Sequence, residues 1–144
     1  MEINGHEIKP CVNLQGVDIS NADLVGVDLT RSSLQDSNLE GAQLTGAYLI
    51  NTNLEDANLR YAVLQGANLT GANLAGADLT DANLARVNLE YANLAGANLT
   101  GACLSGANLH GADFTGANLT GARLNNIKNA CLTGAYIPQP KEEQ

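Results

Sequence analysis

A large apolar residue recurs every five positions from Leu14 to Leu124, twenty-three times without a slip. Twenty-one of these residues are Leu, and the two exceptions are Ile19 and Phe114. A small residue, most often Ala, stands two positions before each of them, and Asn or Asp lies between the two in 17 of the 23 repeats. Gly stands two positions after the large residue in 13 of the 23 repeats. The consensus of the repeat is therefore Ala-Asn/Asp-Leu-X-Gly.

A period of five residues fits neither an amphipathic helix nor a long straight strand. In an extended Ala-Asn-Leu segment, Ala and Leu point to one side and Asn points to the other. The X-Gly pair suits a turn, because Gly readily adopts positive φ. A chain that alternates short extended segments with turns winds into a coil, and stacked coils bury columns of Leu and Ala. Such a narrow core needs little aromatic bulk, and the chain has four Tyr, one Phe and no Trp.

Several segments carry the full consensus, among them 67–71 (Ala-Asn-Leu-Thr-Gly), 72–76 (Ala-Asn-Leu-Ala-Gly) and 97–101 (Ala-Asn-Leu-Thr-Gly). The chain thereby resembles the pentapeptide-repeat family, over roughly four-fifths of its length. The resemblance implies an all-β fold, a right-handed quadrilateral β-solenoid with four repeats per coil and the large and small residues pointing inward. The 23 repeats make about six coils. At roughly 4.8 Å per coil, the rod is on the order of 28 Å long.

The repeats divide the 144 residues into four predicted segments. Residues 1–11 hold Ile3, Ile8 and Pro10 and are expected to form an N-terminal cap, because an open solenoid end exposes strand edges and core. Residues 12–126 form the solenoid. After Leu124 the apolar residues leave the five-residue register, so 127–137 are expected to form an out-of-register C-terminal coil or cap, and 138–144 a tail.

The chain carries a formal charge of −8, and its acids fall unevenly when residues twenty apart are stacked. Two adjacent sides of the coil hold eight acids and one base, whereas the other two hold three of each. The candidate acidic ridge comprises Asp18, Asp36, Glu40, Glu55, Asp56, Asp78 and Asp81.

Two interpretations of this ridge remain open. The family resemblance implies that it imitates DNA, because some pentapeptide-repeat proteins resemble B-DNA in shape and charge and bind type II topoisomerases such as DNA gyrase. The eight acids are about half of the charge that a duplex of the same length carries, at one charge per roughly 1.7 Å. The alternative interpretation is a solvated face that keeps the protein soluble.

Apolar side chains at outward or corner positions form a second candidate surface, which clusters on the two less acidic sides. Such clusters often mark surfaces for a protein partner or for a second copy of the chain, although scattered surface apolar residues are also normal. The candidate patch comprises Val25, Tyr48, Ile50, Tyr61 and Val63.

The sequence offers no site for catalysis or for a metal. His6 and His110 fall on unrelated parts of the chain, and a rod filled by Leu and Ala leaves no pocket for convergent groups. Cys11, Cys103 and Cys131 are widely spaced, and we see no secretory signal, so we expect free thiols in the cytoplasm. The acidic charge disfavours direct binding to nucleic acid, and no apolar run is long enough to span a membrane.

The sequence thus predicts a non-enzymatic acidic rod without a cofactor, acting as a protein-binding or scaffold module. Its partner is an unidentified protein or, as a homodimer, a second copy of the chain. The alternative function is a DNA mimic that inhibits or protects DNA gyrase or a related topoisomerase.

Overall fold

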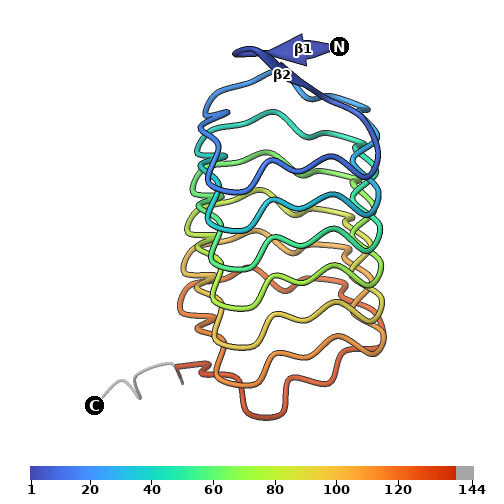
Figure 1. The fold of residues 1–144 in the computed structure, drawn as a ribbon. Coiled ribbons are helices and arrows are strands. Elements are labelled where there is room, and N and C mark those ends of the chain that lie inside the picture. Colours follow the sequence, from blue (N-terminus) through green and yellow to red (C-terminus); the bar gives the residue numbers. More distant parts are fainter. Residues whose placement is uncertain (139–144) are drawn as a thin grey trace, which may run out of the picture.

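The computed structural model describes residues 1–138, which wind into a stack of coils (Figure 1). Isolated parallel bridges join residues twenty positions apart, from Asn13 with Ser33 through to Asn108 with Lys128. Because each repeat has five residues, four repeats complete one coil and each coil has four sides. We number the sides one to four by the first bridged residue of each, and name each corner by the two sides that it joins. These first residues are Asn13, Asp18, Asp23 and Asp28.

The backbone hydrogen bonds explain why the repeat has the residues it has. In the repeat 72–76, three N–H groups donate to carbonyls of the neighbouring coils at 2.6–3.0 Å, and the first N–H donates across the preceding corner at 3.0 Å. The remaining N–H, that of Ala75, donates to Oδ1 of Asn73 at 3.1 Å. The same side-chain bond is present in all 17 repeats that have Asn or Asp in the middle. The middle Asn or Asp therefore satisfies the donor that the coils leave unpaired.

Each corner is a turn whose third residue has a positive φ, as in a type II turn. This residue has a φ between 53° and 72° in all 23 repeats, and it is Gly in 13 of them. In six others it is Asn or Asp, which tolerate the left-handed region better than other residues with a side chain. The remaining four are Arg31, Tyr61, Arg86 and Tyr91.

The core is a set of stacked columns, as the alternation of inward and outward residues predicts. Every large repeat residue from Leu14 to Leu119 is at most 2% exposed. Three small inward positions hold hydroxyl groups instead of methyl groups, and these are buried but paired. Ser37 donates to the carbonyl of Leu34 at 2.6 Å, and Thr52 donates to the carbonyl of Leu29 at 2.8 Å. The hydroxyls thus bind corner carbonyls, which removes the cost of burying them.

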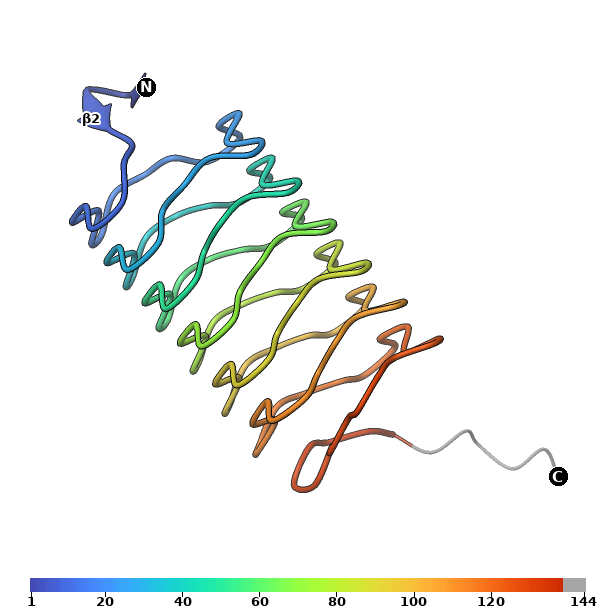
Figure 2. The same cartoon turned by 90° about the vertical axis from the view of Figure 1, so that its right-hand side faces the viewer.

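A short hairpin lies over the N-terminal end of the stack (Figure 2). Its antiparallel strands are β1 (Glu2–Ile3) and β2 (His6–Glu7), joined by Asn4 and Gly5 with φ values of 51° and 78°. Two consecutive positive φ values identify the type I′ turn that Asn-Gly favours. Ile8, directly after β2, is buried and belongs to the core. The hairpin and Ile8 together cover the first coil.

The C-terminal end closes by a change of spacing. Lys128 still pairs with the preceding coil, donating to Ala107 and accepting from Leu109 at 3.0 Å each, so the twenty-residue register runs two residues beyond the predicted boundary at 126. Asn118 then pairs with Tyr136, only eighteen positions later. The last coil is therefore two residues shorter than the others. Of the predicted tail, residues 139–144 lie outside the described residues. Within residues 1–138, no helix is long and apolar enough to cross a membrane.

Candidate functional surfaces

The outward side chains come from three positions of the repeat: the middle of a side and the two residues of a corner. The backbone ladder fixes these positions in columns, so that residues twenty apart lie next to each other at roughly 4.8 Å. The inward side chains are buried, so the outward positions are the ones accessible to other molecules.

The predicted acidic ridge lies on side two and on the two corners that flank it. Asp18 and Asp78 stand on side two itself, Asp36, Glu55 and Asp56 at the one–two corner, and Glu40 and Asp81 at the two–three corner. All are exposed except Asp78, which is half-buried. The ridge is confined to the first four coils. Further along side two the middle residues are Asn98 and Asn118, and the charge ends there.

Arg60 is the one base of this ridge. Its guanidinium lies 5.6 Å from the centre of the Tyr61 ring. Tyr61 raises the pKa of Arg60, with smaller contributions from the charges of Asp78 and Glu40. Arg60 forms no ion pair within the described residues. The ion pair found there joins Lys9 to Glu7, at 2.9 Å on the exposed N-terminal segment. The carboxylates of the ridge thus form no ion pair within residues 1–138, although Asp18, Asp78 and Glu40 accept hydrogen bonds from neighbouring groups.

Three aspartates have a lowered pKa because they accept hydrogen bonds from the corner residue two positions later. Hydrogen bonds from the backbone N–H and hydroxyl of Ser20 hold the pKa of Asp18 below its usual range. The hydroxyl and N–H of Thr30 lower the pKa of Asp28 in the same way. Those of Thr115 lower the pKa of Asp113. The cause is the donor pair that the repeat presents to its middle residue.

The predicted apolar patch is spread around one half of the rod. Val25, Tyr48 and Tyr61 are exposed by 56%, 52% and 51%, while Ile50 and Val63 are half-buried. Tyr61 and Val63 lie at the two–three corner and on side three, whereas Tyr48 and Ile50 lie on side four and at the four–one corner. The structure therefore presents two small apolar groups, with Val25 at the corner between them.

Besides the terminal Met1, three large exposed apolar side chains were missed by the sequence reasoning: Tyr91, Tyr136 and Ile137, at 63%, 61% and 38% exposure. Tyr91 occupies the same left-handed corner position as Tyr61, so its place in the repeat was a usable signal. Its ring meets that of His110 edge-on, with 5.4 Å between centroids. Tyr136 and Ile137 are exposed because they end the shortened last coil, which the repeat does not encode.

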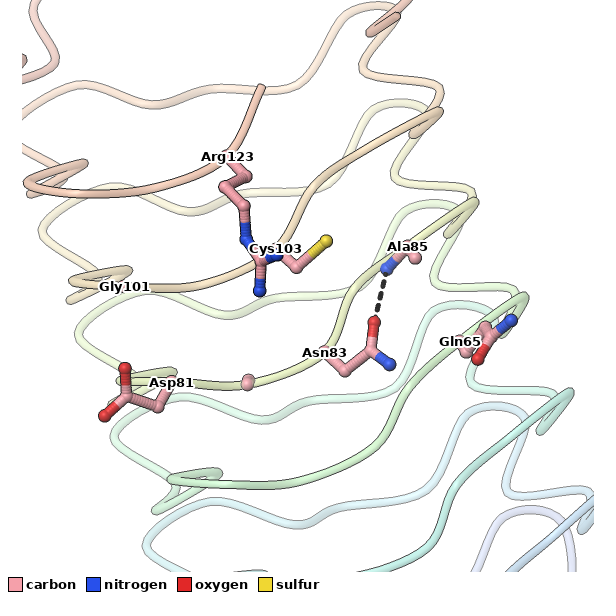
Figure 3. Close-up of a pocket in the computed structure, with 8 residues that line it drawn as sticks. Gln65, Asp81, Asn83, Ala85, Gly101, Cys103 and Arg123 are labelled. Carbon is pink, nitrogen blue, oxygen red and sulfur yellow. Dashed lines mark hydrogen bonds between the residues drawn. The ribbon is translucent and has the colours of Figure 1, made fainter. Parts of the chain in front are cut away.

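A shallow depression of about 320 Å³ lies on side three and its flanking corners (Figure 3). Gln65, Asp81, Asn83, Cys103 and Arg123 line it, together with small residues. The three cysteines are free thiols, and Cys103 is the half-buried one. Within residues 1–138, no three His, Cys, Asp or Glu side chains come together to hold a metal ion.

The pentapeptide-repeat family model matches the chain in eight copies, over residues 13–49, 37–76, 67–106 and 92–136. Among solved structures, HetL of the cyanobacterium Nostoc sp. strain PCC 7120, a pentapeptide-repeat protein involved in heterocyst differentiation regulation, is 28% identical. The match covers 90% of each chain, with a TM-score of 0.52. Rfr23 of the cyanobacterium Cyanothece 51142 is 30% identical over 90% of each chain, with a TM-score of 0.60.

A third solved relative, alr5209 of Nostoc PCC 7120, is 35% identical over 70% of this chain and 84% of its own, with a TM-score of 0.61. QnrB1, a plasmid-mediated fluoroquinolone resistance protein, is 18% identical over 90% of this chain and 79% of its own, with a TM-score of 0.63, and shares the fold alone. No curated protein is similar enough to count as a match.

Proposed function

Since the chain belongs to the pentapeptide-repeat family, we propose that it is a non-enzymatic rod that binds a protein partner through its side surfaces. We further propose that its fold is the right-handed quadrilateral solenoid of about six coils that membership of the family implies. The closed core and the regular ladder support a role in presenting side chains at fixed spacings.

The observation that carries this proposal is the exposure of large side chains on a rigid ladder. Tyr48 and Tyr61 are each about half exposed, in a chain with only four Tyr. Tyrosine is enriched among the residues that dominate binding energy at protein interfaces. Tyr61 also holds a left-handed φ of 59°, a conformation that costs an ordinary side chain roughly 1–2 kcal/mol. A Tyr at such a corner, where Gly fits without cost, is better explained by what it contacts than by folding.

A relative points the same way. HetL is a pentapeptide repeat protein involved in the regulation of heterocyst differentiation, and a rod that binds a protein partner suits a regulatory role. At 28% identity we carry over only this general mode of action to the present chain.

The test is affinity capture of partners with three forms of the protein: wild type, a Tyr48→Thr/Tyr61→Asn variant and an acid-neutralised variant. Asn suits the left-handed corner, so the first variant keeps the fold. The second, Asp36→Asn/Glu40→Gln/Glu55→Gln/Asp56→Asn, leaves both tyrosines in place and removes charge alone from the acidic ridge. We expect a partner that the tyrosine variant loses and the acid variant keeps. A partner set that neither variant changes would contradict the assignment to these surfaces.

A second candidate function is favoured by the carboxylates of the acidic ridge, which form no ion pair within residues 1–138. A surface with seven acids, one base and no ion pair within the described residues suits a positively charged partner, such as the DNA-binding surface of a gyrase. The test is a gyrase supercoiling assay with the purified protein at low and moderate salt. Inhibition that weakens with salt and disappears in the acid-neutralised variant would place this function first. Absence of inhibition at tens of micromolar would remove it.

A further inference from the structure

The depression on side three combines a nucleophile with a cation that has no acidic partner. It lies where small residues stand next to long ones: Ala85, Gly101 and Cys103 line it beside Gln65 and Arg123. Arg123 follows Cys103 in the bridged column of side three, and its side chain extends along the side toward Cys103 (Figure 3). Within residues 1–138, Arg123 has no carboxylate at ion-pair distance. Asp81 also lines the depression, so one acid and one base face it, but the two are not at ion-pair distance and Arg123 stays available for an anionic group.

The thiol of Cys103 stands where 17 other repeats have an Asn or Asp acceptor. Its Sγ atom lies 3.5 Å from Oγ of Ser105. Hydrogen bonding with the hydroxyl and the N–H of Ser105, and the charge of Arg123, lower the pKa of Cys103. The thiolate, the nucleophilic form of cysteine, is thus favoured on a partly exposed surface beside a guanidinium.

We propose that the depression captures small anionic disulfides, with Arg123 holding the anionic group while Cys103 forms a mixed disulfide. The thiolate Sγ attacks the nearer sulfur of the incoming disulfide, an S–S bond forms to Cys103, and the old S–S bond breaks. The displaced half leaves as a thiolate with the electron pair. Cys103 is oxidised, the displaced half is reduced, and the thiol proton has gone to solvent before attack. The incoming disulfide is the only oxidant that the step needs.

Carboxylate-bearing thiol peptides in their disulfide form are the ligand class that this geometry selects. Their carboxylates match the guanidinium of Arg123, which binds them through two parallel hydrogen bonds. The side chains of Asn83 and Gln65, which also line the depression, supply amide groups for their peptide bonds. This modification goes beyond the proposed function and does not depend on it, because it requires no protein partner.

Cys131 provides a matched comparison within the same chain. Its Sγ atom lies 3.1 Å from Oγ1 of Thr133, and the hydroxyl and N–H of Thr133 lower the pKa of Cys131. It therefore shares with Cys103 the donor pair two residues later, but it is exposed and does not line the depression beside Arg123. A difference between the two thiols reports on the depression and its arginine.

The experiment uses two single-cysteine proteins, Cys11→Ser/Cys131→Ser and Cys11→Ser/Cys103→Ser, with circular dichroism to verify folding. Each is reacted with the dianionic disulfide dithiobis(nitrobenzoate) and with the neutral disulfide dithiodipyridine, over a range of pH and salt. We expect the ratio of anionic to neutral rate constants to be about threefold to tenfold higher at Cys103 than at Cys131, as one nearby charge provides. The excess should fall with salt and disappear in Arg123→Gln.

Oxidised glutathione then tests the ligand class directly, with intact-mass measurement on the wild-type protein. We expect one adduct, located by peptide mapping at Cys103, formed more slowly in Arg123→Gln. Equal rate ratios at the two cysteines, an unchanged ratio in Arg123→Gln, or adducts mainly at Cys11 or Cys131 would each overturn the proposal.

Discussion

The middle of the stack and its C-terminal end are built from similar apolar residues, but only the middle is sealed. From Leu54 to Leu109 every large repeat residue is at most 1% exposed, whereas Leu124 and Leu132 are only partly buried against the core. The difference lies in the neighbours. A coil in the middle pairs with a coil on each side, and the last coil pairs on one side alone. Burial is therefore a property of stacking, and each coil depends on the coils next to it.

The largest effect that this comparison predicts is a charge placed in the middle of the core. Leu74 is 0% exposed and lies in a column of large repeat residues. Leu74→Asp buries a carboxylate without a partner, which costs several kcal/mol and should abolish cooperative unfolding. Thermal denaturation followed by circular dichroism measures it.

Leu124→Asp is the matched control at the end of the stack. Because Leu124 is half-buried, its carboxylate can reach water, and we expect a folded protein with a reduced melting temperature. Equal damage from the two variants would show that the end is as closely packed as the middle and would break the comparison.

A smaller loss of stability is expected from Gly→Ala substitutions at the corners. Two of these glycines distinguish the cost of the left-handed conformation from the cost of a collision between coils. Gly76 and Gly96 have φ values of 67° and 68°, but an added Cβ meets open space at Gly96, whereas at Gly76 it collides with Oδ1 of Asp56 from the preceding coil. Gly96→Ala should cost roughly 1 kcal/mol for the left-handed conformation. Gly76→Ala should cost more, because Asp56 must also move. Chemical denaturation of both variants, and of Gly76→Ala in an Asp56→Gly background, tests whether that contact accounts for the excess.

Removing the middle Asn of a repeat should also lower stability, and by more in the middle of the stack than in the first coil. Asn73 is half-buried and accepts the N–H of Ala75, while Asn13 in the exposed first coil accepts the N–H of Gln15 at the same 3.1 Å. Asn73→Ala leaves a less accessible donor unpaired and should cost about 1 kcal/mol. At residue 13 water replaces the lost acceptor, so Asn13→Ala should be close to neutral. The free energies of unfolding of the two variants, measured in urea, test this difference. A larger loss of stability from Asn13→Ala than from Asn73→Ala would contradict this account.

Much of the stack could be predicted from the sequence, because one short pattern fixes both the inward and the outward positions. The alternation around Leu74 identifies the core column, and the family resemblance supplies the twenty-residue coil that the bridges show. The pattern also places Asp36 and Glu55 on one flank of the ridge. The pattern does not show that Asp36 and Glu55 lie at the corner between sides one and two. Stacking repeats twenty residues apart assigns all five residues of a repeat to a single side and so does not distinguish side from corner.

The ends and the use of the middle residue were harder to predict. The Asn4-Gly5 hairpin carries a strong local signal that the search for repeats passed over. An Asn in the middle of a side has two possible partners, which are the Asn twenty residues away and the N–H of its own corner. The corner bond is present in every repeat with Asn or Asp in the middle, whereas residues 1–138 contain only two Asn–Asn hydrogen bonds, from Asn58 to Asn38 and from Asn73 to Asn53. The eighteen-residue closing step depends on how the last coil meets the one above, and no five-residue pattern encodes that.

The smallest expected effect is a difference in acid sensitivity between the ends of the stack and its middle. The aspartates with lowered pKa, Asp18, Asp28 and Asp113, lie in the first and last coils. A carboxyl whose folded pKa lies below its unfolded value, about 3.9, binds more protons when unfolded, so it stabilises the fold above that value. This contribution is lost as the pH falls through the folded pKa.

Acid should therefore loosen the ends before the middle. Protection factors from amide hydrogen exchange, measured at several values between about pH 5 and pH 2.5, should fall first for amides of the first and last coils. In Asp18→Asn/Asp28→Asn/Asp113→Asn the side-chain acceptor stays but no longer titrates, so the terminal amides should follow those of the middle. The contribution is small because these carboxylates face solvent. If acid lowers protection equally along the rod in both proteins, the terminal aspartates do not set its acid sensitivity.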